Sequence, residues 1–113
     1  MEFAGIKNYP LLELGLSQIY LNENKILEIE KWFNSCDMSV FSPIKVHDFG
    51  NGKYTIVDGH SRAYVAHKNG VMQVPIVYDN DKLITGEMGQ KLYHADLIWC
   101  ERFGIENISH LEN

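Results

Sequence analysis

The stretch Tyr54-Thr-Ile-Val-Asp-Gly-His-Ser-Arg-Ala-Tyr-Val-Ala-His-Lys-Asn-Gly70 decides the fold of this 113-residue chain. Its first four residues are β-branched or aromatic, which is typical of a short strand. The polar residues 58–60 then interrupt the strand pattern. Residues 62–69 suit a helix, and Gly70 stands where the end of a helix often needs a positive φ. The stretch therefore predicts a strand, a tight polar turn and a helix.

The turn between this strand and this helix has the chemistry of an anion site. The first backbone N–H groups of a helix lack intrahelical acceptors and lie at the positive end of the helix dipole. Phosphate oxygens could bind the amides of residues 60–62, while Arg62 grips the phosphate bidentately. A structural interpretation explains the same residues: an N-cap at Asp58 or Ser61, a positive φ at Gly59 and a surface Arg62. The residue types alone leave both interpretations open.

Hydrophobic spacing predicts further elements on both sides of the central stretch, whereas residues 1–10 show no clear pattern. The expected elements are a strand at 16–20, an amphipathic helix at 25–36, strands at 43–49, 53–57 and 73–78, and a hairpin turn at Asn51-Gly52. The helix at 25–36 carries its apolar residues on one face. We expect Trp32 and Phe33 on that face to belong to the core.

The last third of the chain is expected to be helical. Its apolar residues recur at helix spacing, namely Met88, Leu92, Ala95, Ile98 and Trp99. Gly104 follows them and is a residue type that commonly ends a helix. We expect Trp99 to be a core residue as well. Three apolar residues after the stop predict a short turn that packs back, namely Ile105, Ile108 and Leu111. Since a further helix could begin where the chain ends, we expect residues 1–113 to form one domain at the N-terminus of a longer protein.

Composition narrows the class of protein. The chain is 45% hydrophobic and 22% charged, with a net charge of −5, which suits an ordinary globular domain. Proteins that bind the nucleic-acid backbone regardless of sequence need a basic surface. Because this chain is acidic overall, nucleic acid is not favoured as its sole ligand. We see neither an apolar run of membrane-spanning length nor a signal peptide. Cys36 and Cys100 lack CxxC spacing, and reduced thiols in a cytoplasmic protein are expected.

Several short motifs, taken in order, resemble the ParB/sulfiredoxin superfamily. They are Pro43-Ile-Lys-Val46, the run from Tyr54 to Ala66, Gly70 and Val74-Pro-Ile-Val77. The resemblance covers roughly residues 15–79. It implies an α/β (α+β) domain with a small mixed β-sheet flanked by helices. It says less about activity, because one fold hosts several chemistries.

The resemblance also implies where a site would lie. In this superfamily the pocket is built from the turn before the central helix and from the segment after the first strand, here Leu21-Asn22-Glu23-Asn24. In the free serine kinases of the superfamily, a glutamate after the first strand is the general base, and Glu23 resembles it. The turn 58–62 would hold nucleotide phosphates, with Asp58 binding Mg²⁺ or orienting the turn, and with His60 as a catalytic acid, a phosphate donor or a local hydrogen-bonding group. Glu23 also suits a solvated position near a helix N-terminus.

The sequence differs from the motifs of sulfiredoxin and ParB at several positions, and these differences limit which activities the resemblance implies. On alignment at Arg62, the reactive cysteine of sulfiredoxin falls on His60, so its thiol chemistry is not available. In the ParB turn Gly-Glu-Arg-Arg, the first arginine falls on Ser61 and the second on Arg62. ParB also carries an Asn-Pro-Arg near the first strand, whereas Asn22 is followed here by Glu23-Asn24.

We therefore expect the turn 58–62 to bind a nucleotide or another phosphate-bearing ligand, such as a phosphorylated small molecule, with Mg²⁺ accompanying a nucleotide. The first functional hypothesis is a small-molecule phosphotransferase with Glu23 as the base. The alternative is a non-catalytic module that binds nucleotide, nucleic acid or protein in a plasmid, phage or partitioning context. A nuclease is not favoured, since no cluster of carboxylates suggests one.

Overall fold

A computed structural model describes residues 6–18, 21–34, 37, 41–49, 52–79 and 87–111. The strands in these ranges are β1 (Lys7–Pro10), β2 (Gly15–Leu16), β3 (Ile44–Asp48), β4 (Tyr54–Asp58) and β5 (Gln73–Tyr78). The helices are α1 (Glu23–Trp32), α2 (His60–Lys68) and α4 (Glu87–Arg102), with 3-10 turns η1 (Leu11–Glu13) and η3 (Ile108–His110). Among them, no helix is both long and apolar enough to span a bilayer.

The five strands form one mixed sheet in the order β1-β5-β3-β4-β2. The central strand β3 runs antiparallel to β4 and parallel to β5. At the edges, β1 is antiparallel to β5, and β2 is parallel to β4. The pairing of β3 with β4 has an irregularity between Lys45 and Val46, next to the pair Lys45–Asp58 where β4 ends. The small mixed sheet flanked by helices confirms the predicted fold class.

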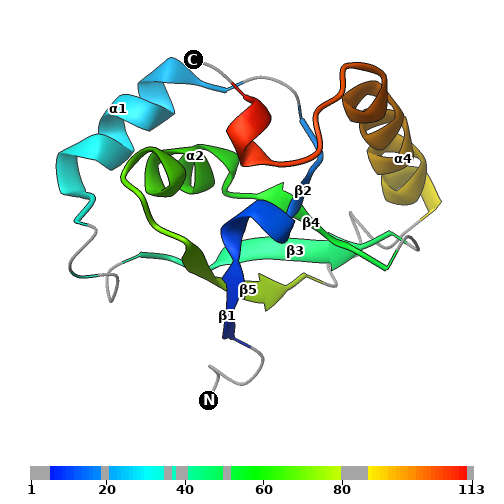
Figure 1. The fold of residues 1–113 in the computed structure, drawn as a ribbon. Coiled ribbons are helices and arrows are strands. Elements are labelled where there is room, and N and C mark those ends of the chain that lie inside the picture. Colours follow the sequence, from blue (N-terminus) through cyan, green and yellow to red (C-terminus); the bar gives the residue numbers. More distant parts are fainter. Residues whose placement is uncertain are drawn as a thin grey trace.

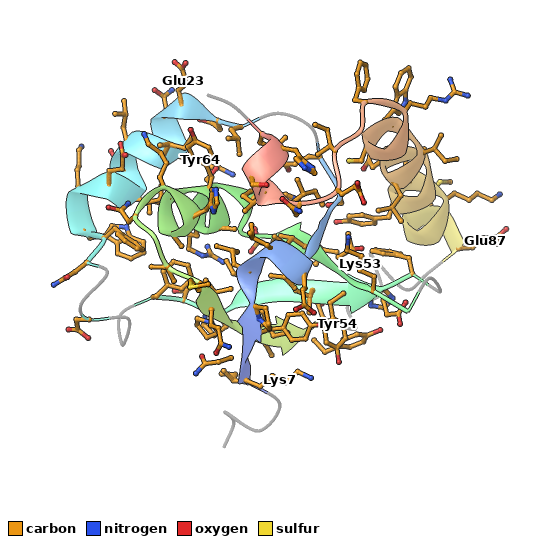
Figure 2. The ribbon with its side chains drawn as sticks, viewed as in Figure 1. Lys7, Glu23, Lys53, Tyr54, Tyr64 and Glu87 are labelled. Atoms are coloured by element: carbon orange, nitrogen blue, oxygen red, sulfur yellow. The ribbon has the colours of Figure 1, made fainter. Side chains whose placement is uncertain are left out.

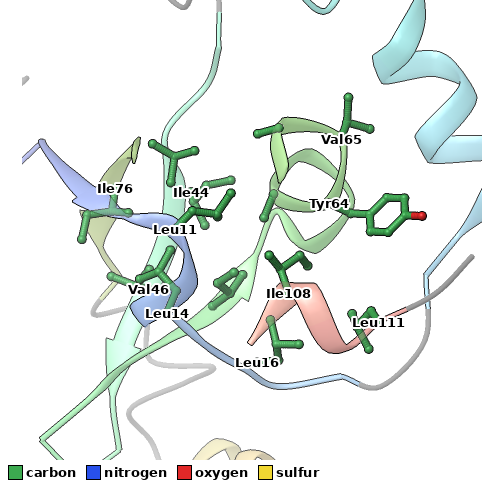
Figure 3. Packing of buried hydrophobic residues seen from close by; sticks show 14 of the residues in the cluster. Leu11, Leu14, Leu16, Ile44, Val46, Tyr64, Val65, Ile76, Ile108 and Leu111 are labelled. Atoms are coloured by element: carbon green, nitrogen blue, oxygen red, sulfur yellow. The ribbon is translucent and has the colours of Figure 1, made fainter. Parts of the chain in front are cut away.

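One face of the sheet and α2 form the core. Figure 1 shows α2 lying across the sheet, with α1 and α4 on opposite sides of the molecule. Small residues on α2, such as Ala63 and Ala66, are fully buried and let the helix approach the sheet closely. The core side chains labelled in Figure 3 come from the sheet, from α2, and from η1 and η3 with the residue that follows each. Seven of them are at most 1% exposed: Leu11, Leu14, Ile44, Val46, Val65, Ile76 and Ile108.

The central prediction is confirmed, since β4, a tight turn and α2 follow one another and Gly70 adopts a φ of +78° after the helix. The short turn expected near the C-terminus is confirmed by η3, whose Ile108 is buried. The strand expected at 16–20 is only partly described: β2 covers Gly15–Leu16, and residues 19–20 lie outside the described residues. Of the predicted hairpin turn, the structure describes Gly52, which has a φ of +73°.

Three predictions for the fold are wrong. Residues 7–10 form the edge strand β1, held by backbone pairing to β5 rather than by an apolar pattern. Trp32 and Trp99 were expected in the core but are 41% and 52% exposed. A helical repeat of apolar residues shows that a helix has an apolar face, but not that this chain covers it. Phe33, by contrast, packs partly buried against the core.

Candidate functional site

Gly59 forms the turn between β4 and α2 and cannot be replaced without strain. Its φ is +111°, a conformation that side-chain-bearing residues rarely adopt. A Cβ atom on Gly59 would lie 2.8 Å from Nη2 of Arg62 and 2.8 Å from Cδ1 of Ile44. The backbone therefore passes closely beneath the Arg62 guanidinium at the point where the helix begins.

The N-terminus of α2 has free backbone donors. Gly59 is the N-cap, and no side chain caps the helix, so neither Asp58 nor Ser61 plays the capping role of the structural interpretation. The first intrahelical hydrogen bond runs from the Ala63 N–H to the Gly59 carbonyl, at 2.9 Å. Within the described ranges, no protein group accepts a hydrogen bond from the amides of residues 60–62. They remain available to an anion.

A pocket of about 620 Å³ opens at this helix N-terminus, and α1 forms its second wall. Besides Asn24 in its first turn, α1 contributes Lys25, Glu28, Ile29 and Trp32 to the lining. These four, from Lys25 to Trp32, are spaced i, i+3, i+4 and i+7 and therefore lie on one face of the helix. Residues 57–62 form the opposite wall, and Gln18, Asn22 and Ser42 complete the lining. The pocket therefore combines free amides, polar amide side chains, two cationic residues and an aromatic ring.

Arg62 lines this pocket and is partly engaged by the protein. Its Nη2 donates a hydrogen bond to the Pro43 carbonyl at 3.2 Å. Its Nε is buried and has no partner among the described residues. A guanidinium has five N–H donors, so the bond to Pro43 fixes the side chain and leaves donors for a ligand.

His60 lines the same pocket but is only 4% exposed. Its Nε2 accepts a hydrogen bond from the Ser17 N–H at 3.1 Å, which assigns the ring proton to Nδ1 when the ring is neutral. Burial lowers the pKa of His60 from 6.5 to about 4, although the nearby Asp58 carboxylate opposes this shift. At neutral pH the ring is therefore uncharged. This geometry favours the local hydrogen-bonding role over that of a catalytic acid, which stays a prediction.

The two predicted carboxylates differ in position. Asp58 is exposed, lines the pocket and precedes the free amides. Glu23 is exposed and is not among the lining residues, and Figure 2 shows its side chain at the outer end of α1, pointing away from α2. The carboxylate that α1 does bring to the pocket is Glu28, which forms an ion pair with Lys31 at 3.0 Å. The role of Glu23 as a general base stays a prediction.

Sequence reasoning found the turn but missed the α1 wall. The spacing of Lys25, Glu28 and Trp32 could have indicated a shared face, yet only the packing of α1 beside α2 shows that this face borders the turn. Among the described residues, no group of three histidine, cysteine, aspartate or glutamate side chains could hold a metal ion. Mg²⁺ needs only one or two carboxylates when phosphate oxygens and water complete its shell, so Asp58 fits that smaller role.

Comparisons with known proteins bear on the fold. The structure superposes on protein Atu1540 from Agrobacterium tumefaciens with a TM-score of 0.63 and 20% identity, covering 96% of this chain and 61% of the other. It superposes on C-terminally truncated SbnI from Staphylococcus aureus with a TM-score of 0.51 and 22% identity, covering 69% and 32%. The chain has a ParB/sulfiredoxin-like fold.

The likeness goes no further than this fold, because both identities are below 25%. No protein-family model and no curated protein sequence matches the chain. The chain also spans less than two thirds of either structural neighbour. Its activity must therefore be argued from its own site.

Proposed function

We propose that this ParB-like domain binds a phosphate-bearing ligand, in the first place a nucleotide, at the turn 58–62. The observation that carries the proposal is the set of free amides of residues 60–62, which border a pocket of about 620 Å³. A helix N-terminus attracts anions through its unpaired N–H groups and its dipole. Small-molecule sites commonly occupy pockets of about 300–1,000 Å³, so the space suits a ligand larger than free phosphate.

Several of the lining residues have a role in this proposal. The amides and the Ser61 hydroxyl hold phosphate oxygens, and Arg62 neutralises their charge while Pro43 fixes its orientation. Lys25 adds a second positive charge from α1. Asp58 would repel phosphate directly, but it suits a Mg²⁺ ion shared with the ligand. The exposed ring of Trp32 provides a surface on which a base could stack.

Phosphotransfer is not part of this proposal. A general base must come within hydrogen-bond reach of the hydroxyl that it activates, and Glu23 does not line the pocket. The placement of Glu23 favours binding without catalysis by that residue. A role in binding nucleic acid or a protein partner stays a prediction from the sequence resemblance.

A thermal-shift screen tests the proposed function. The intact chain is melted with ATP, ADP, CTP, pyrophosphate or phosphate, each with and without Mg²⁺. A ligand that binds only the folded state raises the melting temperature, by an amount that grows with its concentration. We expect at least one nucleotide to raise it more than phosphate does, and more with Mg²⁺ present. A melting temperature that stays constant at millimolar concentrations of every ligand would refute nucleotide binding.

A further inference from the structure

A second hollow lies between α4 and the ends of β2 and β4, and the proposed phosphate site does not use it. Its volume is about 770 Å³, which is within the range of small-molecule sites. One wall consists of α4 side chains, and the other consists of Ser17, Gln18 and Val57. Since Gln18 and Val57 also line the pocket at the turn 58–62, the two hollows are neighbours.

The α4 wall of this hollow is apolar and largely aromatic. Leu92, Trp99 and Phe103 line it and are 61%, 52% and 60% exposed, in chain order. The rings of Trp99 and Phe103 stack with their centroids 5.8 Å apart. Because large apolar side chains gain free energy when they leave water, this wall favours a ligand with an apolar body.

Contacts with the rest of the domain hold this wall in place. The Tyr93 ring also lines the hollow and stacks on Phe49, with centroids 5.0 Å apart. The Cys100 thiol is buried and donates to the Leu16 carbonyl at 3.5 Å. These two contacts attach α4 to the domain beside the hollow. The hollow is therefore formed without a ligand, as small-molecule sites commonly are.

The described residues that line the hollow carry one formal charge, and it is negative. This charge is on Asp96, whose exposed side chain a ligand can reach. No cation in the described part of the chain pairs with Asp96. Ser17 offers no donor to a ligand, since both its N–H and its hydroxyl donate to protein groups. The pocket at the turn, by contrast, contains Lys25 and Arg62.

Neighbouring carboxylates make the potential at this hollow more negative. Burial raises the pKa of the Tyr93 hydroxyl. The negative charges of Asp79, Asp96 and Asp58 raise the same pKa further. Although Asp96 is exposed, its surroundings remove part of its hydration and raise the pKa of its carboxyl. A cation bound beside Asp96 would stabilise the charged carboxylate.

The cations described on α4 lie on another flank of the helix. The Arg102 guanidinium carbon is 5.9 Å from the centroid of the Trp99 ring, but Arg102 does not line the hollow. Lys91 pairs with Glu87 at 3.5 Å. By helical position, Arg102 and Lys91 are about 120–140° around the axis from Asp96. They therefore leave the Asp96 side of the hollow to a cation from outside the chain.

We propose that this hollow binds a small organic cation, an ammonium group attached to an apolar body. The ammonium group donates to the Asp96 carboxylate, and the body lies against the rings of Trp99 and Phe103. Aromatic rings attract cations through their negative faces as well. A nucleotide would be repelled by Asp96, so this site is separate from the phosphate site. The two proposals can fail independently.

Phenethylamine and phenethyl alcohol test the proposal, because they share an apolar body and differ in charge. In Trp32→Phe, with no nucleotide present, phenethylamine should change the emission of Trp99 with a saturating dependence on concentration. Phenethyl alcohol should bind about 10-fold more weakly, because it makes no charge-assisted bond to Asp96. In Trp99→Phe, the emission of Trp32 should stay constant. Equal affinities of the two probes, or no saturable response to millimolar phenethylamine, would overturn the proposal.

Asp96→Asn tests the carboxylate, with Glu87→Gln as the matched control. Each substitution removes one negative charge from α4, but Glu87 does not line the hollow. In the Trp32→Phe background, Asp96→Asn should raise the Kd of phenethylamine about 10-fold and leave that of phenethyl alcohol unchanged. Glu87→Gln should change either Kd by less than about twofold, because salt screens a distant exposed charge. Circular dichroism checks that α4 remains helical. Equal effects of the two substitutions would refute a cation site at Asp96.

Discussion

The Nε2 atom of His60 accepts a hydrogen bond from the backbone N–H of Ser17 at a distance of 3.1 Å inside the domain. The bond joins the first residue of α2 to the residue that follows β2. The Ser17 hydroxyl in turn donates to the Ile56 carbonyl at 2.7 Å. A histidine of the candidate site therefore helps to hold the sheet edge against the helix that carries the free amides.

Replacing His60 should change how stability depends on pH. The unfolded imidazole takes up a proton near pH 6.5, whereas the folded one resists protonation until about pH 4. The contribution of neutral His60 to the free energy of unfolding is therefore complete above pH 6.5. It is lost as the pH falls from 6.5 to about 4, by about 3 kcal/mol in total. His60→Gln keeps an acceptor without this titration. Urea unfolding at pH 7.5 and 5 should show a shallower pH dependence for the variant, and equal dependences would contradict the account.

Gly59→Ala should destabilise the protein more than Gly70→Ala. Both glycines have a positive φ, but a Cβ on Gly70 would meet no atom within 4 Å. Backbone strain should cost about 1 kcal/mol at Gly70. At Gly59 the more extreme φ of +111° and the contacts with Arg62 and Ile44 should raise the cost to about 2–4 kcal/mol. Chemical denaturation measures both values, and similar losses would show that the turn tolerates a side chain.

Arg62→Ala should remove most of the ligand-dependent stabilisation and leave the fold intact. The free protein loses one hydrogen bond to Pro43, worth about 1 kcal/mol. The complex loses charge-assisted contacts worth about 1.5–3 kcal/mol, which weakens nucleotide binding by about 10- to 100-fold. Lys68→Ala, at the other end of α2, is the matched control because it removes a charge away from the pocket. Unfolding of Arg62→Ala would mean that the guanidinium is structural.

The fold was predictable where sequence pattern and local structure coincide. The β-branched run of β4 and the polar turn with its glycine indicated their structures directly. The strand β1 was not predictable in this way, because Lys7-Asn-Tyr-Pro10 has little strand character and depends on pairing with β5. The exposure of Trp99 was also out of reach, since periodicity defines an apolar face but not its partner.

The candidate site was predictable in its backbone but not in its second wall. Residues 58–62 were found from the turn and the family resemblance. Placing Lys25, Glu28 and Trp32 beside them requires knowing how α1 packs on α2. The same packing leaves Glu23, the first residue of α1, outside the pocket lining. Which carboxylate of α1 lies near the turn 58–62 thus depends on a tertiary contact that no local motif specifies.

Tryptophan fluorescence should locate the ligand, because the chain has two tryptophans and only Trp32 lines the pocket at the turn. In Trp99→Phe, nucleotide should change the emission of the remaining Trp32 with a saturating dependence on concentration. In Trp32→Phe, the emission of Trp99 should stay constant at the same concentrations. A response from Trp99 alone would place the ligand on α4 and refute the proposed pocket.

The most direct measurement is a titration of ¹⁵N-labelled protein with Mg²⁺–ATP and, separately, with pyrophosphate, followed by amide chemical shifts. The account predicts that the amides of His60, Ser61 and Arg62 shift together and saturate, while those of Asn69 and Gly70 at the far end of α2 remain in place. Ligand binding that leaves the three amides unchanged, or no binding of either ligand, would contradict a phosphate site at this turn.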